Sequence, residues 1–241
     1  MKLQRLLSYV RQAVDDYRMI DSSDVIAVGV SGGKDSLALL YALKELQHFY
    51  PNPYTIKAIT VDLGLGNQNT DEIEQLCKSM EIEYHIVRTE IGTIIFKERH
   101  EKNPCSLCAK MRKGALNNEA LRIGCNKVAY AHHQDDVIET MLMSLIYEGR
   151  FHTFSPYTHW DKTGLSLIRP FIYTRECDII GFQNKYLLPV AKNPCPADRN
   201  TKRQYIKSML ANINRENPGV KERLFHSIIN GTLEEWNLPY S

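Results

Sequence analysis

Residues 25–36 have the sequence Val-Ile-Ala-Val-Gly-Val-Ser-Gly-Gly-Lys-Asp-Ser, and this stretch determines the predicted fold. The first half, Val25–Val30, is short, apolar and mostly β-branched, which is typical of a buried strand. A glycine-rich turn follows, and a helical periodicity of apolar residues begins at Ser36. A buried strand that leads through a tight turn into a helix is the repeating unit of parallel α/β sheets.

The alternation of strand and helix continues to residue 186. Further strands are predicted at 54–62, 84–89, 127–131 and 167–172, and helices at 36–49, 70–80, 106–123, 135–147 and 175–186. An amphipathic helix at 2–17 precedes this region, and helical segments at 200–213 and 218–230 follow it. We therefore predict an α/β fold with a Rossmann-like parallel sheet, helices on both faces, an N-terminal helix and a small C-terminal helical tail. The predicted domain boundaries are 1–20, 21–190 and 191–241.

The composition is that of a globular protein, because 43% of the 241 residues are hydrophobic and 24% are charged. The net charge of +2 is too small to indicate a nucleic-acid-binding protein by itself. No apolar run approaches the roughly 20 residues of a membrane span, and the first residues do not form an apolar signal core. We expect a cytoplasmic protein without a membrane partner. In that compartment the six cysteines favour metal binding, redox chemistry or packing over disulfides.

The turn Ser31-Gly-Gly-Lys-Asp-Ser36 has the chemistry of an anion site. Its two glycines let the backbone approach a ligand closely, and the N–H groups at the start of the next helix favour phosphate. Lys34 adds a positive charge, the serines add hydroxyl donors, and Asp35 offers an oxygen ligand for Mg²⁺. The spacing does not fit a Walker A loop, because an aspartate follows the lysine.

This turn matches the S-G-G-x-D-S pyrophosphate loop, and through it the chain resembles the N-type ATP pyrophosphatases. The resemblance implies an adenine nucleotide alpha-hydrolase-like sheet that binds ATP, transfers AMP to a carbonyl oxygen and releases pyrophosphate. It also implies a catalytic role for Asp35. The residues expected to bind ATP are Ser31, Gly32, Gly33, Lys34, Asp35, Ser36, Asp62 and His132.

A second polar cluster, Ala131-His-His-Gln-Asp-Asp136, follows the fourth predicted strand. Loops after neighbouring parallel strands meet at one edge of a sheet, so we expect this cluster to lie beside the glycine-rich turn. Asp135 and Asp136 have two interpretations: they hold the Mg²⁺ that bridges the ATP phosphates, or they cap the helix that begins there. The spacing does not choose between the two aspartates. A zinc site at the two histidines is a further alternative, although no His or Cys partner lies nearby in the sequence.

The cysteines divide into two groups. Cys105-Ser-Leu-Cys108 opens a predicted helix, where thiols ionise more readily, and Cys195 stands between two prolines. A zinc ribbon would need a second C-x-x-C, which the sequence does not contain. Three thiolates suit an iron–sulfur cluster that keeps one iron open. We interpret the other three as packing residues: Cys77, Cys125 and Cys177.

Together the motifs make the chain resemble the tRNA 2-thiocytidine synthetase family. The matching positions are Asp16–Ile20, Ser31–Ser36, Cys105–Cys108 with Arg112 and Gly114, His132–Asp136, Ile168–Pro170 and Arg203–Gln204. The resemblance implies a homodimer that uses ATP, Mg²⁺ and a 4Fe-4S cluster held by Cys105, Cys108 and Cys195. Many members carry C-x-x-C in the late loop, where this chain has Lys192 and Cys195, and the cluster needs only one cysteine from that loop.

The implied reaction thiolates a cytidine in the anticodon loop of tRNA. The C2 carbonyl oxygen is first adenylated, so that AMP leaves when sulfur carried on the open iron attacks C2. The sulfur donor is a cysteine desulfurase or free sulfide. The residues expected to contact the RNA are Arg112, Lys202, Arg203 and Lys207. For the last three, a solvated basic helix face is the alternative interpretation.

Other functions stay open from the sequence. A cluster-free ATP-dependent ligase that forms lysidine or an amide would share both loops, and a sister thiolase would act on another base or on a small molecule. A non-catalytic RNA- or nucleotide-binding protein is a third alternative. Iron and labile-sulfide analysis separates the thiolase from the ligase, and pyrophosphate release separates an enzyme from a binding protein.

Overall fold

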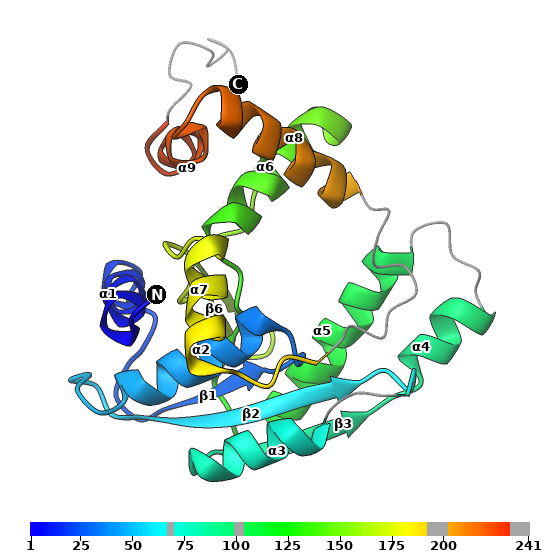
Figure 1. Ribbon diagram of the computed structural model, residues 1–241. Coiled ribbons are helices and arrows are strands. Elements are labelled where there is room, and N and C mark those ends of the chain that lie inside the picture. The colour runs from blue at the N-terminus through cyan, green and yellow to red at the C-terminus, as the bar shows by residue number, and fades with distance from the viewer. Residues whose placement is uncertain (67–69, 99–103, 192–201, 232–241) are drawn as a thin grey trace. The chain divides into compact units, whose positions relative to one another are not determined.

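The computed structural model of the chain describes residues 1–66, 70–98, 104–191 and 202–231 (Figure 1). Its strands are β1 (Asp24–Gly29), β2 (Tyr54–Asp62), β3 (Glu83–Arg88), β4 (Lys127–Ala129), β5 (Tyr157–Trp160) and β6 (Leu165–Ile168). Its helices are α1 (Leu3–Asp16), α2 (Lys34–Leu46), α3 (Thr70–Ser79), α4 (Ile91–Thr93), α5 (Pro104–Arg122), α6 (Gln134–Glu148), α7 (Glu176–Tyr186), α8 (Lys202–Glu216) and α9 (Val220–Asn230). Within these ranges no helix has both the length and the apolar character needed to cross a membrane.

The strands form one sheet in the order β3-β2-β1-β4-β6-β5. All neighbouring strands pair in parallel except β5 and β6, which are antiparallel. The chain adds β2 and β3 on one side of β1 and then returns to add β4 on the other side, so the strand order reverses at β1. The carboxyl ends of β1 and β4 therefore flank the point at which open α/β sheets bind ligands.

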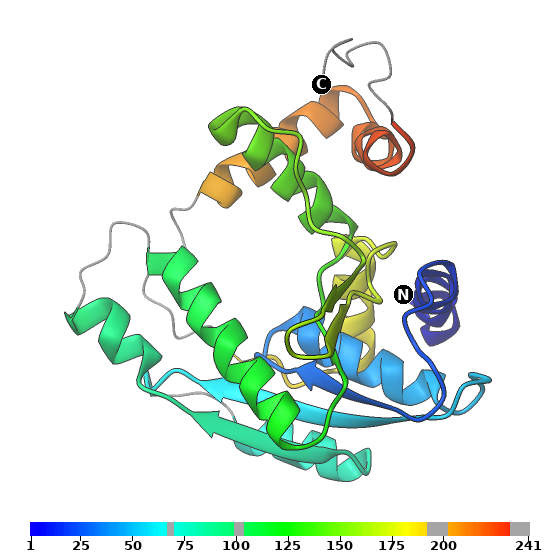
Figure 2. The same cartoon turned by 180° about the vertical axis from the view of Figure 1, so that it is seen from behind.

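Helices cover both faces of this sheet. Leu116 and Ala120 of α5 are buried against Ala27 and its neighbours on one face, and Figure 2 shows α5 running across the strands. Side chains alternate along a strand, so Ile26 and Val28 of β1 point to the opposite face, where α2 contacts the strand. Helices α1 and α7 pack in turn on α2 (Figure 1). The predicted Rossmann-like fold is confirmed.

The contacts within the chain define two compact units. Unit 1 consists of Met1–His133 and Ser155–Asp198 and contains the whole sheet. Unit 2 consists of Gln134–Phe154 and Arg199–Ser241, in which α6 contacts both α8 and α9. Helix α6 thus groups with the C-terminal helices although it follows β4 directly in the sequence. The functional division at residues 20 and 190 stays a prediction.

Some elements differ from those predicted. The fifth predicted strand, 167–172, is Leu165–Ile168, because the chain turns at Arg169 and Pro170 and the Ile172 N–H bonds to the Arg169 carbonyl. The edge strand β5 was not predicted, since its four residues carry no apolar alternation. Helix α4 and the π-helical turn Ile94–Glu98 that continues it were also missed.

Replacing Leu116 tests the packing of α5 on the sheet. Leu116→Ala should lower the free energy of unfolding by about 2–5 kcal/mol, because it removes a side chain that is 95% buried and leaves a cavity. Leu121→Ala on the same helix is the control, and its effect should stay within about 0.5 kcal/mol because Leu121 is exposed. Urea unfolding monitored by circular dichroism measures both values. Equal losses in the two variants would contradict this account of the core.

Candidate active site

The turn after β1 is held in shape by its own serines. The Ser36 hydroxyl accepts a hydrogen bond from the Ser31 N–H at 3.1 Å and donates one to the Gly33 carbonyl at 2.9 Å. Gly32 has a φ of +79°, a conformation that favours glycine, and a Cβ there would lie 3.2 Å from that of Ala191. At Gly33 φ is −79°, and a Cβ would meet only the Ser31 hydroxyl, at 3.4 Å. Gly32 is therefore required by the backbone, whereas Gly33 leaves room for a ligand to approach.

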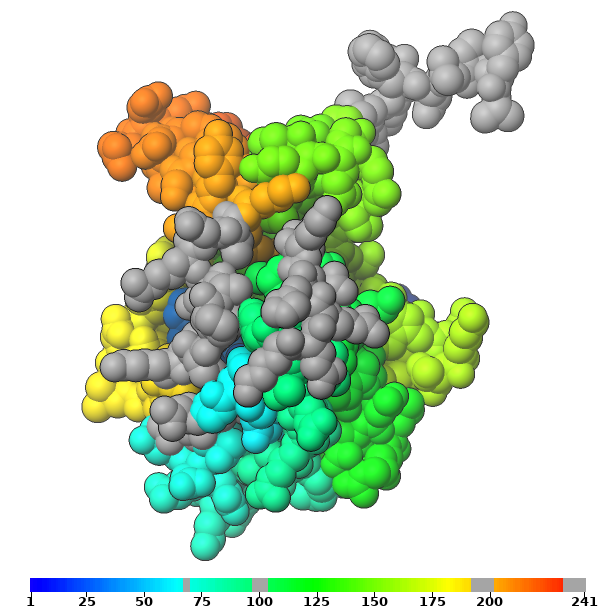
Figure 3. Space-filling model, turned by 90° about the vertical axis from the view of Figure 1, so that its right-hand side faces the viewer, coloured from blue at the N-terminus to red at the C-terminus, as the bar shows by residue number. Residues whose placement is uncertain are grey.

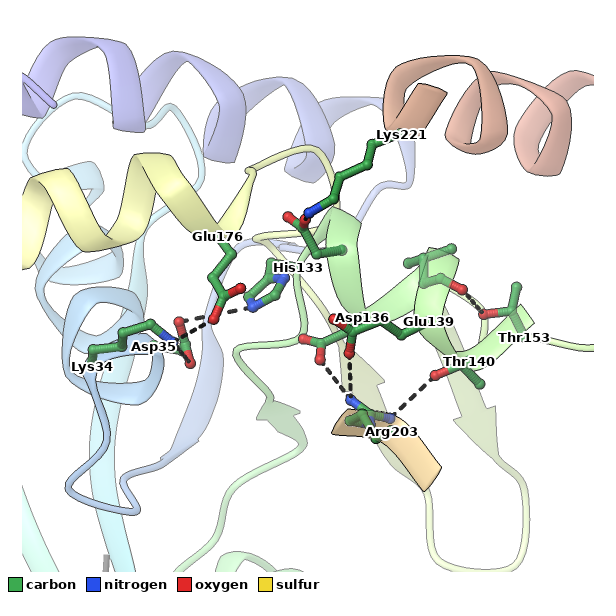
Figure 4. A network of polar contacts seen from close by, with 12 residues as sticks. Lys34, Asp35, His133, Asp136, Glu139, Thr140, Thr153, Glu176, Arg203 and Lys221 are labelled. Atoms are coloured by element: carbon green, nitrogen blue, oxygen red, sulfur yellow. Dashed lines mark hydrogen bonds and ion pairs between the residues drawn. The ribbon is translucent and has the colours of Figure 1, made fainter. Parts of the chain in front are cut away.

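Lys34 links this turn to helix α7. Its ammonium donates to Asp35 Oδ2 at 3.0 Å and to Glu176 Oε1 at 3.1 Å (Figure 4). Burial lowers the pKa of Lys34, but the two carboxylates raise it by more, so the net shift is upward and the lysine stays charged. Sequence reasoning missed Glu176, because an acidic residue in the first turn of a helix is ordinary.

One carboxylate oxygen of Asp35, Oδ1, is buried without a hydrogen bond from the described residues. The Nε2 atom of His133 lies 3.9 Å from it, and Figure 4 shows the ring next to this carboxylate. A buried carboxylate oxygen without a hydrogen bond is costly unless a cation meets it, so the residue fits the role of a Mg²⁺ ligand. The contact with His133 also confirms that the loops after β1 and β4 lie side by side.

Asp62 ends β2 and His132 follows β4, the two strands that flank β1 in the sheet. His132 Nδ1 accepts a hydrogen bond from Arg169 Nε at 3.2 Å, which places the proton of the neutral ring on Nε2. Asp62 is the last residue of β2, and its Oδ1 accepts a hydrogen bond from the Gly64 N–H at 2.9 Å. Both residues therefore stand at the carboxyl edge of the sheet, as predicted, and their contacts with ATP stay a prediction.

Arg169 is a buried cation that sequence reasoning left without a role. It follows β6 directly, donates to His132 Nδ1 and to the Ser155 carbonyl, and is 7% exposed. Burial lowers its pKa to about 10. Beside it, burial raises the pKa of Tyr130 to about 12, and the Tyr130 hydroxyl has no hydrogen-bond partner within the described residues. The only signal in the sequence was the match of Ile168-Arg-Pro170 to the family, and that match did not indicate what Arg169 does.

Asp135 and Asp136 lie in the first turn of α6, and unit 2 supplies a cation to each. Lys221 of α9 donates to Asp135 Oδ1 at 2.7 Å, and Arg203 of α8 donates to Asp136 Oδ1 at 2.7 Å (Figure 4). Arg203 also lies 3.7 Å from Glu139. A Mg²⁺ ion at either aspartate would have to compete with these ion pairs, and their role as metal ligands stays a prediction.

The remaining predicted RNA contacts lie on two helices. Arg112 is a half-buried residue of α5, where its charge acts on Tyr130. Lys202 and Lys207 belong to α8, the first exposed and the second half-buried.

The cysteines of the predicted cluster lie at the start of α5. Cys105 is exposed, and Cys108 is half-buried beside the hydrophobic core. Three residues apart on a helix, the two thiols share one face. Cys195 lies outside the described residues, and within the described part no three His, Cys, Asp or Glu side chains converge as a metal site. The structure therefore describes two of the three thiols that the resemblance implies.

The other cysteines separate by burial. Cys77 and Cys125 are buried, which raises the pKa of each thiol to about 11 and agrees with the packing role predicted for them. Cys177 is exposed in the first turn of α7, so the packing interpretation is wrong for this residue. The sequence around Cys177 gave no indication of which side of the helix would face solvent.

Alkylation of the cluster-free, reduced protein tests these environments. Iodoacetamide at mildly alkaline pH should label Cys105 and Cys177 and spare Cys77 and Cys125, because only ionised and accessible thiols react. Peptide mass spectrometry gives the rate at each position. Labelling of Cys77 or Cys125 as fast as Cys105 would contradict the burial described here.

Comparison with known proteins places this geometry in a family. Residues 4–213 match the family model of the PP-loop domain. A tRNA-cytidine(32) 2-sulfurtransferase from Geotalea uraniireducens is 37% identical over 231 residues, which are 94% of this chain and 91% of that protein. One from Geobacter sulfurreducens is 33% identical and covers 95% of this chain and 91% of its own length.

A solved structure shares both the sheet and the sequence pattern. It is the U34-tRNA thiolase from Methanococcus maripaludis with its 4Fe-4S cluster, at a TM-score of 0.76 and 26% identity. The match covers 94% of this chain and 77% of that one. On these similarities the chain belongs to the PP-loop family, in the group formed by the tRNA-cytidine(32) 2-sulfurtransferases.

Proposed function

We propose that this chain is an ATP-dependent tRNA sulfurtransferase that replaces the C2 oxygen of an anticodon-loop cytidine with sulfur. The observation that carries the proposal is the pair of thiols, Cys105 and Cys108, on one face at the start of α5. A ligase that forms lysidine or an amide uses the pyrophosphate loop but has no need of this pair. The names of the relatives and the cluster of the structural neighbour support the same function.

In this proposal the turn after β1 holds ATP. The N–H groups at the start of α2 and the ammonium of Lys34 would meet the phosphates. Asp35 would hold Mg²⁺ through its buried Oδ1, and the ion would neutralise charge on the departing pyrophosphate. His132 would act as a donor to ATP through Nε2, since its Nδ1 accepts from Arg169.

The chemistry consists of two substitutions. The C2 carbonyl oxygen of the cytidine attacks the α-phosphate of ATP, and the bond between this phosphorus and pyrophosphate breaks. A sulfur nucleophile then attacks C2, and the C–O bond breaks as AMP leaves with the former carbonyl oxygen. Cys105, Cys108 and Cys195 would hold the 4Fe-4S cluster, which supplies the sulfur chemistry when bound.

The setting of the reaction is also a proposal. We propose a homodimer that works in the cytoplasm, where tRNA is modified. A cysteine desulfurase or free sulfide would supply the sulfur. Free sulfide is already at the oxidation level of the thiolated product, whereas the outer sulfur of a desulfurase persulfide needs two electrons from a thiol reductant before it acts as sulfide.

Two substitutions in the turn test the ATP site. Gly33→Val should abolish ATP-dependent pyrophosphate release without unfolding the chain, because the backbone there tolerates a side chain that would fill the ligand space. Asp35→Asn should have the same effect by removing a charge that the metal needs. Asp161→Asn is the control, because this carboxylate is fully exposed in unit 1. Isothermal titration with ATP and Mg²⁺ measures binding, and unchanged affinity in both turn variants would contradict the proposed site.

The cysteines provide a second, independent test. After anaerobic purification, Cys105→Ala, Cys108→Ala and Cys195→Ala should each lose visible absorbance, iron and labile sulfide, together with formation of thiolated cytidine in tRNA. The matched controls should retain all four properties: Cys77→Ala, Cys125→Ala and Cys177→Ala. Zinc without iron in the unmodified protein would overturn the thiolase proposal and favour the ligase. A full cluster in the Cys195 variant would show that the third ligand is misassigned.

A further inference from the structure

We infer that unit 2 presents a surface on which unpaired bases of the RNA substrate stack. This stacking surface consists of Tyr147 of α6 and of Lys202 and Tyr205 of α8. The inference rests on the proposed function, because it takes tRNA as the substrate and names the part of the chain that would hold the bases of its loop.

Arg203 determines how α8 lies on α6. Its guanidinium donates to Asp136 Oδ1 at 2.7 Å and to Thr140 Oγ1 at 3.3 Å. Asp136, Thr140 and Tyr147 are four and seven residues apart, so they share one face of α6. The two helices contact each other along this face. Arg203 is therefore a positioning residue, and the residue before it, Lys202, meets the far end of the same face.

Lys202 contacts Tyr147 at the surface, and Tyr205 lies one turn after Lys202 on α8. Lys202 Nζ lies 4.6 Å from the centroid of the Tyr147 ring, which is 41% exposed. Tyr205 follows Lys202 by three residues on α8, so the two side chains share a face, and Tyr205 is 61% exposed. Figure 3 shows α8, in orange, adjoining the end of α6, in light green, on the surface of unit 2.

The charge of helix α8 favours a nucleic acid over an apolar protein as the partner of this surface. Helix α8 carries a single acidic residue, Glu216, against four basic ones, Lys202, Arg203, Lys207 and Arg215, of which Arg203 is ion-paired with Asp136. Aromatic rings beside basic groups are the combination that binds single-stranded nucleic acids, because bases stack on the rings and phosphates meet the cations. The exposed tyrosines would contribute to affinity at little entropic cost, since their side chains have few rotamers.

The test measures binding of the complete, cluster-loaded protein to an RNA hairpin with a single-stranded loop, by fluorescence anisotropy. Tyr147→Ala and Tyr205→Ala should each weaken binding roughly 5- to 100-fold, the range expected for losing one stacked base. Tyr205→Phe should bind the hairpin as tightly as the unmodified protein does. Tyr205→Leu should bind as weakly as Tyr205→Ala, because only an aromatic ring stacks on a base. Lys202→Gln should reduce the slope of log affinity against log salt by about 0.7.

The control is Phe49→Ala, which removes a similarly exposed ring from unit 1 and should leave affinity unchanged. A blunt RNA duplex should bind the tyrosine variants and the unmodified protein equally well. If the unmodified protein bound the hairpin and both alanine variants bound it with the same affinity, the stacking surface would be overturned. Unchanged affinity in Tyr205→Leu would overturn it as well. If the unmodified protein bound no RNA at all, the proposed function itself would fail.

Discussion

The parallel pairing of β1 with β4 is the constraint on which the candidate site depends. Its register sets Val28 opposite Ala129, so the chain leaves both strands at the same level of the sheet. From there one loop enters the turn that carries Asp35 and the other reaches His133, and the two side chains meet 3.9 Å apart. The turn is secured from the other side as well, because the Val30 N–H donates to the Ile59 carbonyl and Thr60 Oγ1 donates to the Val30 carbonyl.

The carboxylates of the two units differ in their partners, and this difference determines where a divalent cation would bind most easily. In unit 1 Asp35 shares Lys34 with Glu176 and keeps one buried oxygen without a hydrogen bond among the described residues. In unit 2 Asp135 and Asp136 receive short contacts from Lys221 and Arg203. A divalent cation would complete the environment of Asp35, whereas at the other two carboxylates it would displace an existing partner. This contrast supports the metal role proposed for Asp35, and the ion pairs connect the two carboxylates of α6 with the C-terminal helices.

Sequence reasoning predicted what depends on local pattern and missed what depends on tertiary contact. The strand at 54–62 and the turn at 31–36 were predictable, because apolar run length and glycine spacing are local properties. Glu176 and Arg169 were not, since one looks like any acidic residue in a first turn and the other acquires its role only by being buried against His132. The grouping of α6 with α8 and α9 could not be predicted either, because it depends on ion pairs between residues more than sixty positions apart.

In the proposed reaction the base oxygen is activated at the switch point between β1 and β4 and leaves as part of AMP. The most direct measurement uses an anticodon stem-loop RNA whose target cytidine carries ¹⁸O at C2, incubated with the anaerobic, cluster-loaded protein, ATP, Mg²⁺ and sulfide. Mass spectrometry of the released nucleotide should find ¹⁸O in AMP, in an amount equal to the thiolated cytidine formed, together with unlabelled pyrophosphate. Formation of ADP with ¹⁸O in inorganic phosphate, or thiolation with unlabelled AMP, would contradict the account.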